Sequence, residues 1–249
     1  MSAPRAIALC QCFNGALEFQ AGRWAEAEAA LRESISLYRE IGAASGEALA
    51  CQRLGLLQTA AGQLAAGLAT LEEGVLAAEH ALMRAHCLAR LYATMTRNRL
   101  AANDLAAADR ALDLGLLMSA RHGHCATCDA LLLPAAVSVR VAQGDLAAAE
   151  TFCRQLAEAA SQHTSRTWLA MSSQTQAELA AARGEIETAL TRYVEAYEGF
   201  RQANYDYEAA RCLAAVAQLR LAHGAPGDVE LAQAAQFEAS QILARLGAG

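Results

Sequence analysis

Hydrophobic residues recur at intervals of three and four along almost the whole chain, with polar residues between them. The first forty residues show this pattern on both sides of Gly22, with apolar side chains at Ile7, Leu9, Phe13, Ala16, Leu17, Phe19, Trp24, Ala27, Leu31, Ile35 and Tyr38. Spacings of three and four place such residues on one face of an α-helix. The pattern therefore predicts two amphipathic helices joined by a short turn near Gly22.

A turn signal of the same kind recurs about every forty residues. It begins at Gly22, Gly62, Asn103, Gly144, Gly184 and Gly224. Five of the six are Gly, and Asn is the next most tolerant residue in the left-handed conformation that ends many helices. Regular repetition at this period is typical of a solenoid, in which each unit buries its apolar face against its neighbours. The sequence predicts an all-α solenoid of six helical hairpins.

Small and large residues also keep fixed distances from the turn signals. The fifth residue after the signal is small in the first five repeats: Ala27, Gly67, Ala108, Ala149 and Ala189. The ninth is mostly larger: Leu31, Leu71, Leu112, Cys153 and Tyr193. The seventh residue before the signal is mostly small, as at Gly15 and Gly55. We expect the two helices of each pair to cross closely at the small positions.

This pattern resembles the tetratricopeptide repeat (TPR) over about residues 5 to 246, although the consensus Trp, Tyr and Pro are largely missing. The forty-residue period and the segments 38–50 and 200–213 look like the longer TPR-like units in effector regions of large bacterial transcription regulators of the LuxR and maltose-activator type. The resemblance implies a right-handed superhelical solenoid. We expect residues 1–249 to form a single domain with units near 5–43, 44–83, 84–123, 124–164, 165–205 and 206–249.

The composition of the chain excludes several classes of function. The formal net charge is -6, and all 20 basic residues are Arg. A protein without Lys cannot hold the Lys-containing phosphate loop of the resembled regulators, and an acidic balance does not favour direct nucleic-acid binding. No apolar run reaches membrane-spanning length, and the start lacks a secretory signal. We therefore expect a cytoplasmic sensing or docking module, with its eight Cys reduced.

The resemblance also implies a ligand groove on the concave side, lined by the first helix of each unit. Candidate groove residues, carried over by their distance from the turn signals, include Arg90, Arg97, Leu131, Ser138, Gln174, Glu178 and Arg211. Arg90 and Arg97 are two helical turns apart on one face and could hold an acidic effector or a peptide carboxylate. The alternative is that both are solvated or paired with acidic neighbours. The Lys and Asn of the family's carboxylate clamp are absent.

A second candidate site lies at the junction into the fourth unit. His122, His124, Cys125 and Cys128 fall within seven residues, and two Cys spaced in this way can bind zinc or another soft metal. Cys87, preceded by His86, lies sixteen residues before its turn signal, as Cys128 does, so stacking could supply a third thiolate. A Cys at a helix N-terminus also favours the thiolate. Buried structural thiols and a thiol redox switch are the alternatives.

Pro134 falls about nine residues into the predicted seventh helix, where Pro removes a backbone hydrogen bond. We expect this helix either to begin late, after a loop that contains the His/Cys cluster, or to kink. No nucleophile is paired with a base at a convincing spacing, so we do not expect an enzyme. Two hypotheses remain: a non-enzymatic module that docks a protein segment or small effector in its groove, or a metal- or redox-responsive sensor.

Overall fold

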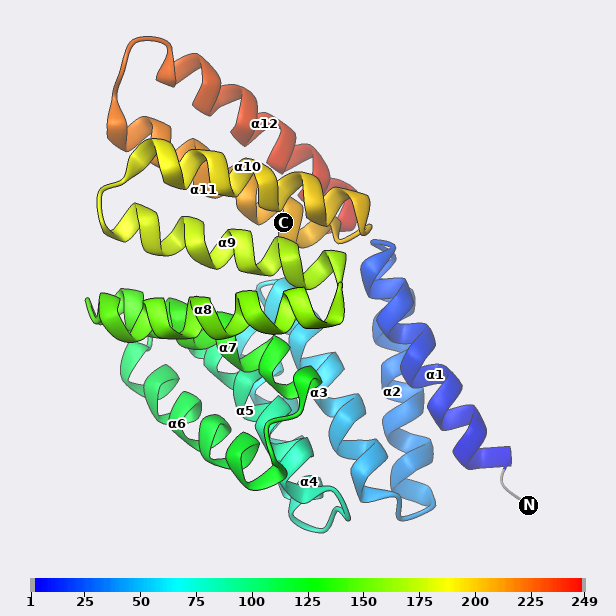
Figure 1. The fold of residues 1–249 in the computed structure, drawn as a ribbon. Helices are drawn as coiled ribbons and strands as arrows, with labels where there is room; N and C mark the ends of the chain where they lie inside the picture. The colour runs from blue at the N-terminus through cyan, green and yellow to red at the C-terminus, as the bar shows by residue number, and fades with distance from the viewer. Residues whose placement is uncertain (1–2, 248–249) are drawn as a thin grey trace. The chain divides into compact units, whose positions relative to one another are not determined.

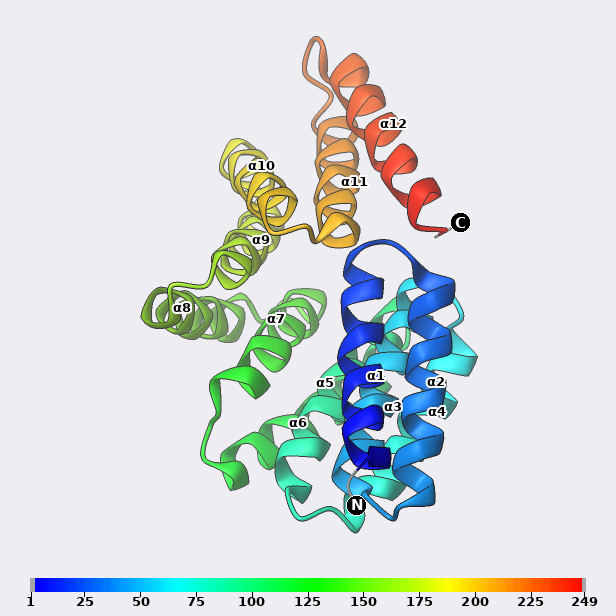
Figure 2. The same ribbon diagram turned by 90° about the vertical axis from the view of Figure 1, so that its right-hand side faces the viewer.

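The computed structural model describes residues 3–247, and this part of the chain folds into twelve α-helices without a strand (Figure 1). The helices are α1 Ala3–Gln20, α2 Trp24–Glu40, α3 Ala44–Ala60, α4 Leu64–Glu79, α5 Arg84–Ala101, α6 Leu105–His122, α7 Ala126–Ala142, α8 Leu146–His163, α9 Arg166–Ala182, α10 Ile186–Gln202, α11 Asp206–His223 and α12 Asp228–Leu246. Consecutive helices form hairpins, as α1 and α2 do in Figures 1 and 2. The predicted all-α fold is confirmed.

The six hairpin turns lie at the six predicted signals. The residue that begins each signal has a left-handed backbone, with φ between 56° and 80°, at Gly22, Gly62, Asn103, Gly144, Gly184 and Gly224. An L-residue with a Cβ pays a steric cost in this conformation, which Gly avoids and Asn tolerates. The recurrence of Gly, with one Asn, therefore follows from the backbone that a tight helical hairpin requires.

The predicted small positions are where paired helices approach most closely. Ala27, Ala108, Ala149 and Ala189 are fully buried. A Cβ added at Gly15 would lie 2.6 Å from Leu31 Cγ, and one at Gly55 would lie 2.5 Å from Leu71 Cγ. Real Cβ contacts are longer than this, so Gly is what allows a Leu of the second helix to pack against the first helix. The alternation of small and large residues in the sequence thus reflects how the two helices of a hairpin pack against each other.

The chain divides into two compact units, and the boundary lies inside α7. The first unit ends at Ala135, and the second runs from Ala136 to Gly247. Leu31, Leu54 and Leu57 belong to a hydrophobic core in the first unit. Leu190, Tyr193 and Phe200 belong to one in the second. The continuous single domain over residues 1–249 and the right-handed superhelix both stay predictions.

Pro134 lies inside α7, which excludes the late start, one of the two expected alternatives; the kink stays a prediction. α7 begins at Ala126, eight residues before Pro134, and continues to Ala142. Its first turn is closed by the Cys125 carbonyl, which accepts hydrogen bonds from the backbone amides of Cys128 at 2.9 Å and Asp129 at 3.1 Å. This early start places the two cysteines at the beginning of a helix rather than in a loop.

None of the helices within residues 3–247 combines the length and the apolar character needed to cross a membrane. This agrees with the sequence, which contains no long apolar run.

Candidate functional site

The turn between α6 and α7 carries the predicted His/Cys cluster, and it has an unusual backbone. Gly123 and the next residue, His124, are both left-handed, with φ of 86° and 54°. The Gly123 and His124 amides donate to the carbonyls of Ala120 at 3.1 Å and Ser119 at 3.0 Å, which closes the end of α6. Two consecutive left-handed residues reverse the chain sharply. Cys125 is thereby set directly before the first residue of α7.

The two cysteines of this turn lie side by side. Cys128 is one helical turn after Cys125, and residues three apart on a helix share a face. The two Sγ atoms are 2.9 Å apart. Cys128 is buried and Cys125 is half-buried, so one thiol faces the interior while the other lies at its edge.

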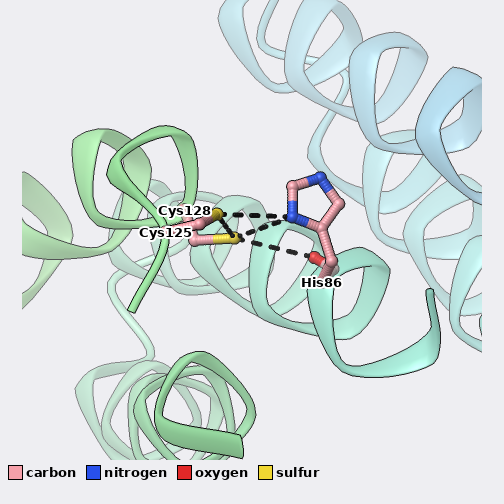
Figure 3. A group of neighbouring side chains, drawn as sticks. All are labelled: His86, Cys125 and Cys128. Carbon is pink, nitrogen blue, oxygen red and sulfur yellow. Dashed lines mark hydrogen bonds between the residues drawn. The ribbon is translucent and has the colours of Figure 1, made fainter. Parts of the chain in front are cut away.

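A histidine from an earlier helix completes a group of three (Figure 3). His86 is the third residue of α5, and its Nδ1 lies 3.4 Å from Cys125 Sγ and 3.2 Å from Cys128 Sγ. These three ligand atoms all lie within 4.8 Å of one another. Figure 3 shows the imidazole of His86 pointing toward both sulfur atoms from the opposite helix. The structure thus brings together Cys125, Cys128 and His86.

The structure does not bring Cys87 to this group, which corrects the expectation of a third thiolate. Cys87 is fully buried, and its Sγ faces the Ser45 carbonyl of α3 at 3.9 Å. The equal distances from the turn signals do place α5 beside Cys128, because the His86 carbonyl is 3.9 Å from Cys128 Sγ. However, one residue along a helix rotates the side chain by about 100°. His86 therefore faces α7, and Cys87 faces α3.

The two other predicted histidines lie at the edge of the group. His122, the last residue of α6, is exposed, and its ring centroid is 4.9 Å from that of His86. His124 is exposed in the turn and contributes its backbone amide to the cap of α6. Of these two histidines, only His122 has its ring beside a residue of the His86, Cys125 and Cys128 group in the described chain.

Electrostatics distinguish the three central side chains. Burial lowers the pKa of His86, and the nearby charges of Arg90 and His122 lower it further, which favours the neutral imidazole. Burial raises the pKa of Cys128 well above its ordinary value. Burial acts in the same direction on Cys125, but hydrogen bonds from Cys128 and Thr127 outweigh it and lower the pKa of Cys125. Cys125 is thus the more readily ionised thiol.

Arg90, predicted to line a ligand groove, lies beside this group. Its Nη1 donates to the Thr127 carbonyl at 3.0 Å and so ties α5 to the first turn of α7. Its Nε is buried, with no hydrogen-bond partner among the residues that the structure describes. Its positive charge acts to lower the pKa of Cys128. Arg90 is therefore a cation fixed against the two thiols.

The other candidate groove residues fall into the two units. Arg97 and Leu131, in the first unit, are half-buried. In the second unit, Ser138 Oγ donates to Glu178 Oε2 at 3.0 Å, and Arg211 Nη1 donates to Glu208 Oε2 at 2.8 Å. Burial raises the pKa of Glu178, although the Ser138 hydrogen bond and the Arg211 charge oppose this shift. Gln174 lies one turn before Glu178 on α9 and is half-buried.

Sequence reasoning missed a group of buried polar contacts that join α5 to α3 and α4 of the preceding hairpin. Gln52 of α3, 2% exposed, donates through Nε2 to Thr94 Oγ1 of α5 at 2.8 Å. Asn98 of α5 donates through Nδ2 to Thr59 Oγ1 and to the Leu64 carbonyl, both at 3.0 Å. A polar residue inside an apolar helical pattern, as at Gln52, was the available signal. These satisfied hydrogen bonds hold neighbouring helices in register.

Comparison with known proteins decides the family. Residues 5–248 match the family described as the MalT-like TPR region. The chain belongs to this family. The fold of this MalT-like TPR region is also similar to the crystal structure of BtubC (BKLC) from P. vanneervenii, with a TM-score of 0.51 and 15% sequence identity, over 98% of this chain and 92% of that one. At this identity the likeness shows the fold alone. No curated protein matches this chain.

Family membership confirms the TPR-like resemblance and makes the chain a helical repeat module. The arrangement at the start of α7 is compatible with two kinds of chemistry in this MalT-like TPR region. Two thiolates and an imidazole are ligands that Zn²⁺ and other soft ions accept. Two adjacent thiols can also be oxidised to a disulfide.

Proposed function

We propose that this chain is a non-enzymatic binding module of a bacterial regulatory protein, and that it docks a protein segment or small effector in a concave groove formed by its first helices. The observation that carries this proposal is the match of residues 5–248 to the MalT-like TPR region. TPR-like repeats present rows of helices as extended binding surfaces. The α-helical hairpins of this chain supply such rows of helices.

The charged residues of the first helices support an acidic ligand in the first unit. Arg90 and Arg97 lie two turns apart on α5, and the guanidinium of Arg90 keeps a buried Nε without a hydrogen-bond partner in the described chain. Guanidinium groups recognise carboxylate and phosphate through paired hydrogen bonds. We propose that an acidic effector or a peptide carboxylate binds here, with the half-buried Leu131 of α7 as a further contact.

The second unit carries a different set of candidate contacts. Ser138 and Glu178 are joined by a hydrogen bond, with Gln174 one turn away on α9 and Arg211 acting on the Glu178 charge. We propose that these groups contact the ligand or partner through hydrogen bonds rather than through net positive charge. The acidic, Lys-free composition supports a module that does not bind nucleic acid directly. We also propose a cytoplasmic location, with which the described helices are consistent, since none of them could cross a membrane.

A binding screen tests the acidic-ligand proposal. The full chain is screened by thermal shift against phosphorylated sugars, carboxylic acids and carboxylate-terminated peptides, and each hit is titrated by calorimetry. We expect Arg97→Ala to weaken a hit by about 10- to 150-fold, the range of a lost charge-assisted hydrogen bond. Arg110→Ala, on the second helix of the same hairpin, is the matched control and should bind as the wild type does. A hit that keeps its affinity in both Arg90→Ala and Arg97→Ala contradicts the assignment to α5.

A further inference from the structure

We propose that His86, Cys125 and Cys128 form a binding site for one Zn²⁺ or a similar soft divalent ion, which links the first turn of α5 to the first turn of α7. The three ligand atoms lie within 4.8 Å of one another. All three residues belong to the first compact unit. The inference does not rest on the proposed ligand groove, because none of the three metal ligands is a groove residue; Arg90 is the one side chain that supports both.

The donor set selects the class of ion. Two sulfur atoms and one imidazole nitrogen suit Zn²⁺ and neighbouring soft or borderline metals, whereas Ca²⁺ and Mg²⁺ require oxygen ligands. No carboxylate belongs to the group. Two thiolates would also balance the charge of a divalent ion.

The distances are close to those of a tetrahedral zinc site. Bond lengths of about 2.3 Å to sulfur and about 2.0 Å to nitrogen imply separations of roughly 3.5 Å between sulfur and nitrogen and roughly 3.7 Å between sulfurs. The observed separations from His86 Nδ1 are 3.4 Å to Cys125 Sγ and 3.2 Å to Cys128 Sγ. The two sulfurs, at 2.9 Å, must move apart by under 1 Å. Cys125 is half-buried in the turn, so rotation of its side chain can supply that movement.

The surroundings hold the three ligands in place. Arg90 donates to the Thr127 carbonyl at 3.0 Å, which fixes the cysteine-bearing turn against α5. Ser119 Oγ donates to Asp129 Oδ1 at 3.0 Å, which fixes the start of α7 against the end of α6. Such supporting contacts set the orientation of the ligands and hence the affinity of a metal site.

Three protein ligands leave one position of a tetrahedral site to be filled. His122 is exposed, and its ring lies beside that of His86, with the centroids 4.9 Å apart. Rotation of the His122 side chain or a water molecule can complete the tetrahedron. A site with three protein ligands and one exchangeable position exposes the bound metal to external ligands.

The position of His86 favours a metal over a disulfide. A disulfide between Cys125 and Cys128 would need only the two thiols of α7. The imidazole nitrogen instead reaches both sulfurs from a different helix, at 3.2 and 3.4 Å. A third donor converging on the same point is what a metal ion requires and what a dithiol does not.

The test is direct metal titration of the reduced full-length chain under anaerobic conditions. Co²⁺ is added as a spectroscopic probe of thiolate coordination, and Zn²⁺ affinity is measured by competition with a chromophoric chelator. We expect one equivalent to bind with sulfur-to-metal charge-transfer bands. Cys125→Ser and Cys128→Ser should each weaken Zn²⁺ binding by about a hundredfold or more, and His86→Gln by about tenfold or more.

Two matched controls keep the result interpretable. His124→Gln changes an exposed histidine of the same turn, and Cys87→Ala removes the thiol next to His86 in sequence; both should bind Zn²⁺ as the wild type does. If a cysteine variant loses its helical circular dichroism, the comparison of His86→Gln with His124→Gln still decides. Equal affinity in these two variants overturns the proposal.

Other outcomes also overturn it. The proposal is wrong if the reduced wild type fails to bind Zn²⁺ at micromolar concentration, or if the double variant Cys125→Ser, Cys128→Ser still binds it. If Cys125 and Cys128 bind no metal when reduced but form a disulfide on mild oxidation, the site is a thiol redox switch and not a metal site.

Discussion

The starts of α3 and α7 occupy the same place in their repeats, but they are built differently. Ala43 and Gly46 lie nineteen and sixteen residues before the signal at Gly62, and Cys125 and Cys128 lie at the same distances before Gly144. At the start of α3, a Cβ on Gly46 would lie 2.5 Å from Tyr38 Cδ1 and 2.6 Å from Tyr38 Cζ. A buried aromatic ring fills this space.

At the start of α7 the position equivalent to Gly46 carries a thiol, Cys128. Cys128 contacts His86 of α5, and Cys125 lies against both. A Gly that leaves room for an aromatic ring in one repeat is thus a thiol beside an imidazole in the other. The comparison teaches that one repeat position can serve the core in one hairpin and carry reactive groups in another, while the surrounding helices keep the same pattern.

The largest expected difference is in thiol reactivity. Burial raises the pKa of Cys51, on α3, to about 12, whereas hydrogen bonds from neighbouring groups lower the pKa of Cys125 despite its partial burial. Cys125 therefore has the larger thiolate population, although the weaker nucleophilicity of the more acidic thiol reduces the resulting difference in rate. Because Cys51 is also fully buried, we expect Cys125 to react with iodoacetamide at least about a hundred times faster.

Mass spectrometry of the alkylated peptides measures these rates site by site. Cys212, whose pKa burial raises to about 12, should behave like Cys51. Zn²⁺ should slow the reaction of Cys125 and Cys128 selectively. Equal rates at Cys51 and Cys125 without metal would show that the two helix starts do not differ chemically.

The next largest effect concerns stability in the presence of metal. A ligand that binds only the folded state stabilises it by about 2.7 kcal/mol at a hundred times its Kd. We expect Zn²⁺ at that concentration to raise the melting temperature of the wild type by roughly 5 to 10 °C, and that of Cys125→Ser by much less. Gly46→Ala, altered at the equivalent start of α3, should show the wild-type shift. A shift that persists in Cys125→Ser would place the stabilising metal elsewhere.

The smallest effect is the difference in packing without metal. Gly46→Ala forces a methyl group against the Tyr38 ring, which is 6% exposed, and should destabilise the protein by about 1 to 3 kcal/mol. Cys128→Ala only removes a buried sulfur and should cost about 1 kcal/mol. Urea denaturation of both variants measures the free energies of unfolding. A larger loss in Cys128→Ala would mean that the thiol group has a packing role like that of Tyr38.

The fold could be predicted because its determinants are local and repeated. The six turn signals anticipated six left-handed residues, and Asn103 took the place of Gly with φ of 56°. Gly15 and Gly55 were identified as close crossings from their spacing, and each lies against a Leu of the paired helix. The repeat period and the residue sizes are sufficient to predict the turns and the close crossings, because both features arise within one hairpin and not from distant contacts.

The candidate site was less predictable because it depends on the rotation of a helix. The equal distances of Cys87 and Cys128 from their turn signals correctly predicted that this part of α5 lies beside the start of α7. They pointed to Cys87, however, whose side chain faces α3, whereas the neighbouring His86 faces α7. Pro134 left two alternatives, a late start or a kink, and the structure excludes the late start. Its ring restricts the backbone locally, but it could not indicate that the Cys125 carbonyl begins α7 at Ala126.

The hairpin turns have a further consequence for how such a chain can evolve. A Cβ added at Gly62, Gly144, Gly184 or Gly224 would have no neighbour within 4 Å, although all four residues are left-handed. Selection at these sites therefore acts on backbone handedness and not on side-chain volume. Asn103 demonstrates that a polar side chain is accepted there. Repeats of this kind can acquire new surface chemistry one turn at a time, while the buried interior remains unaltered.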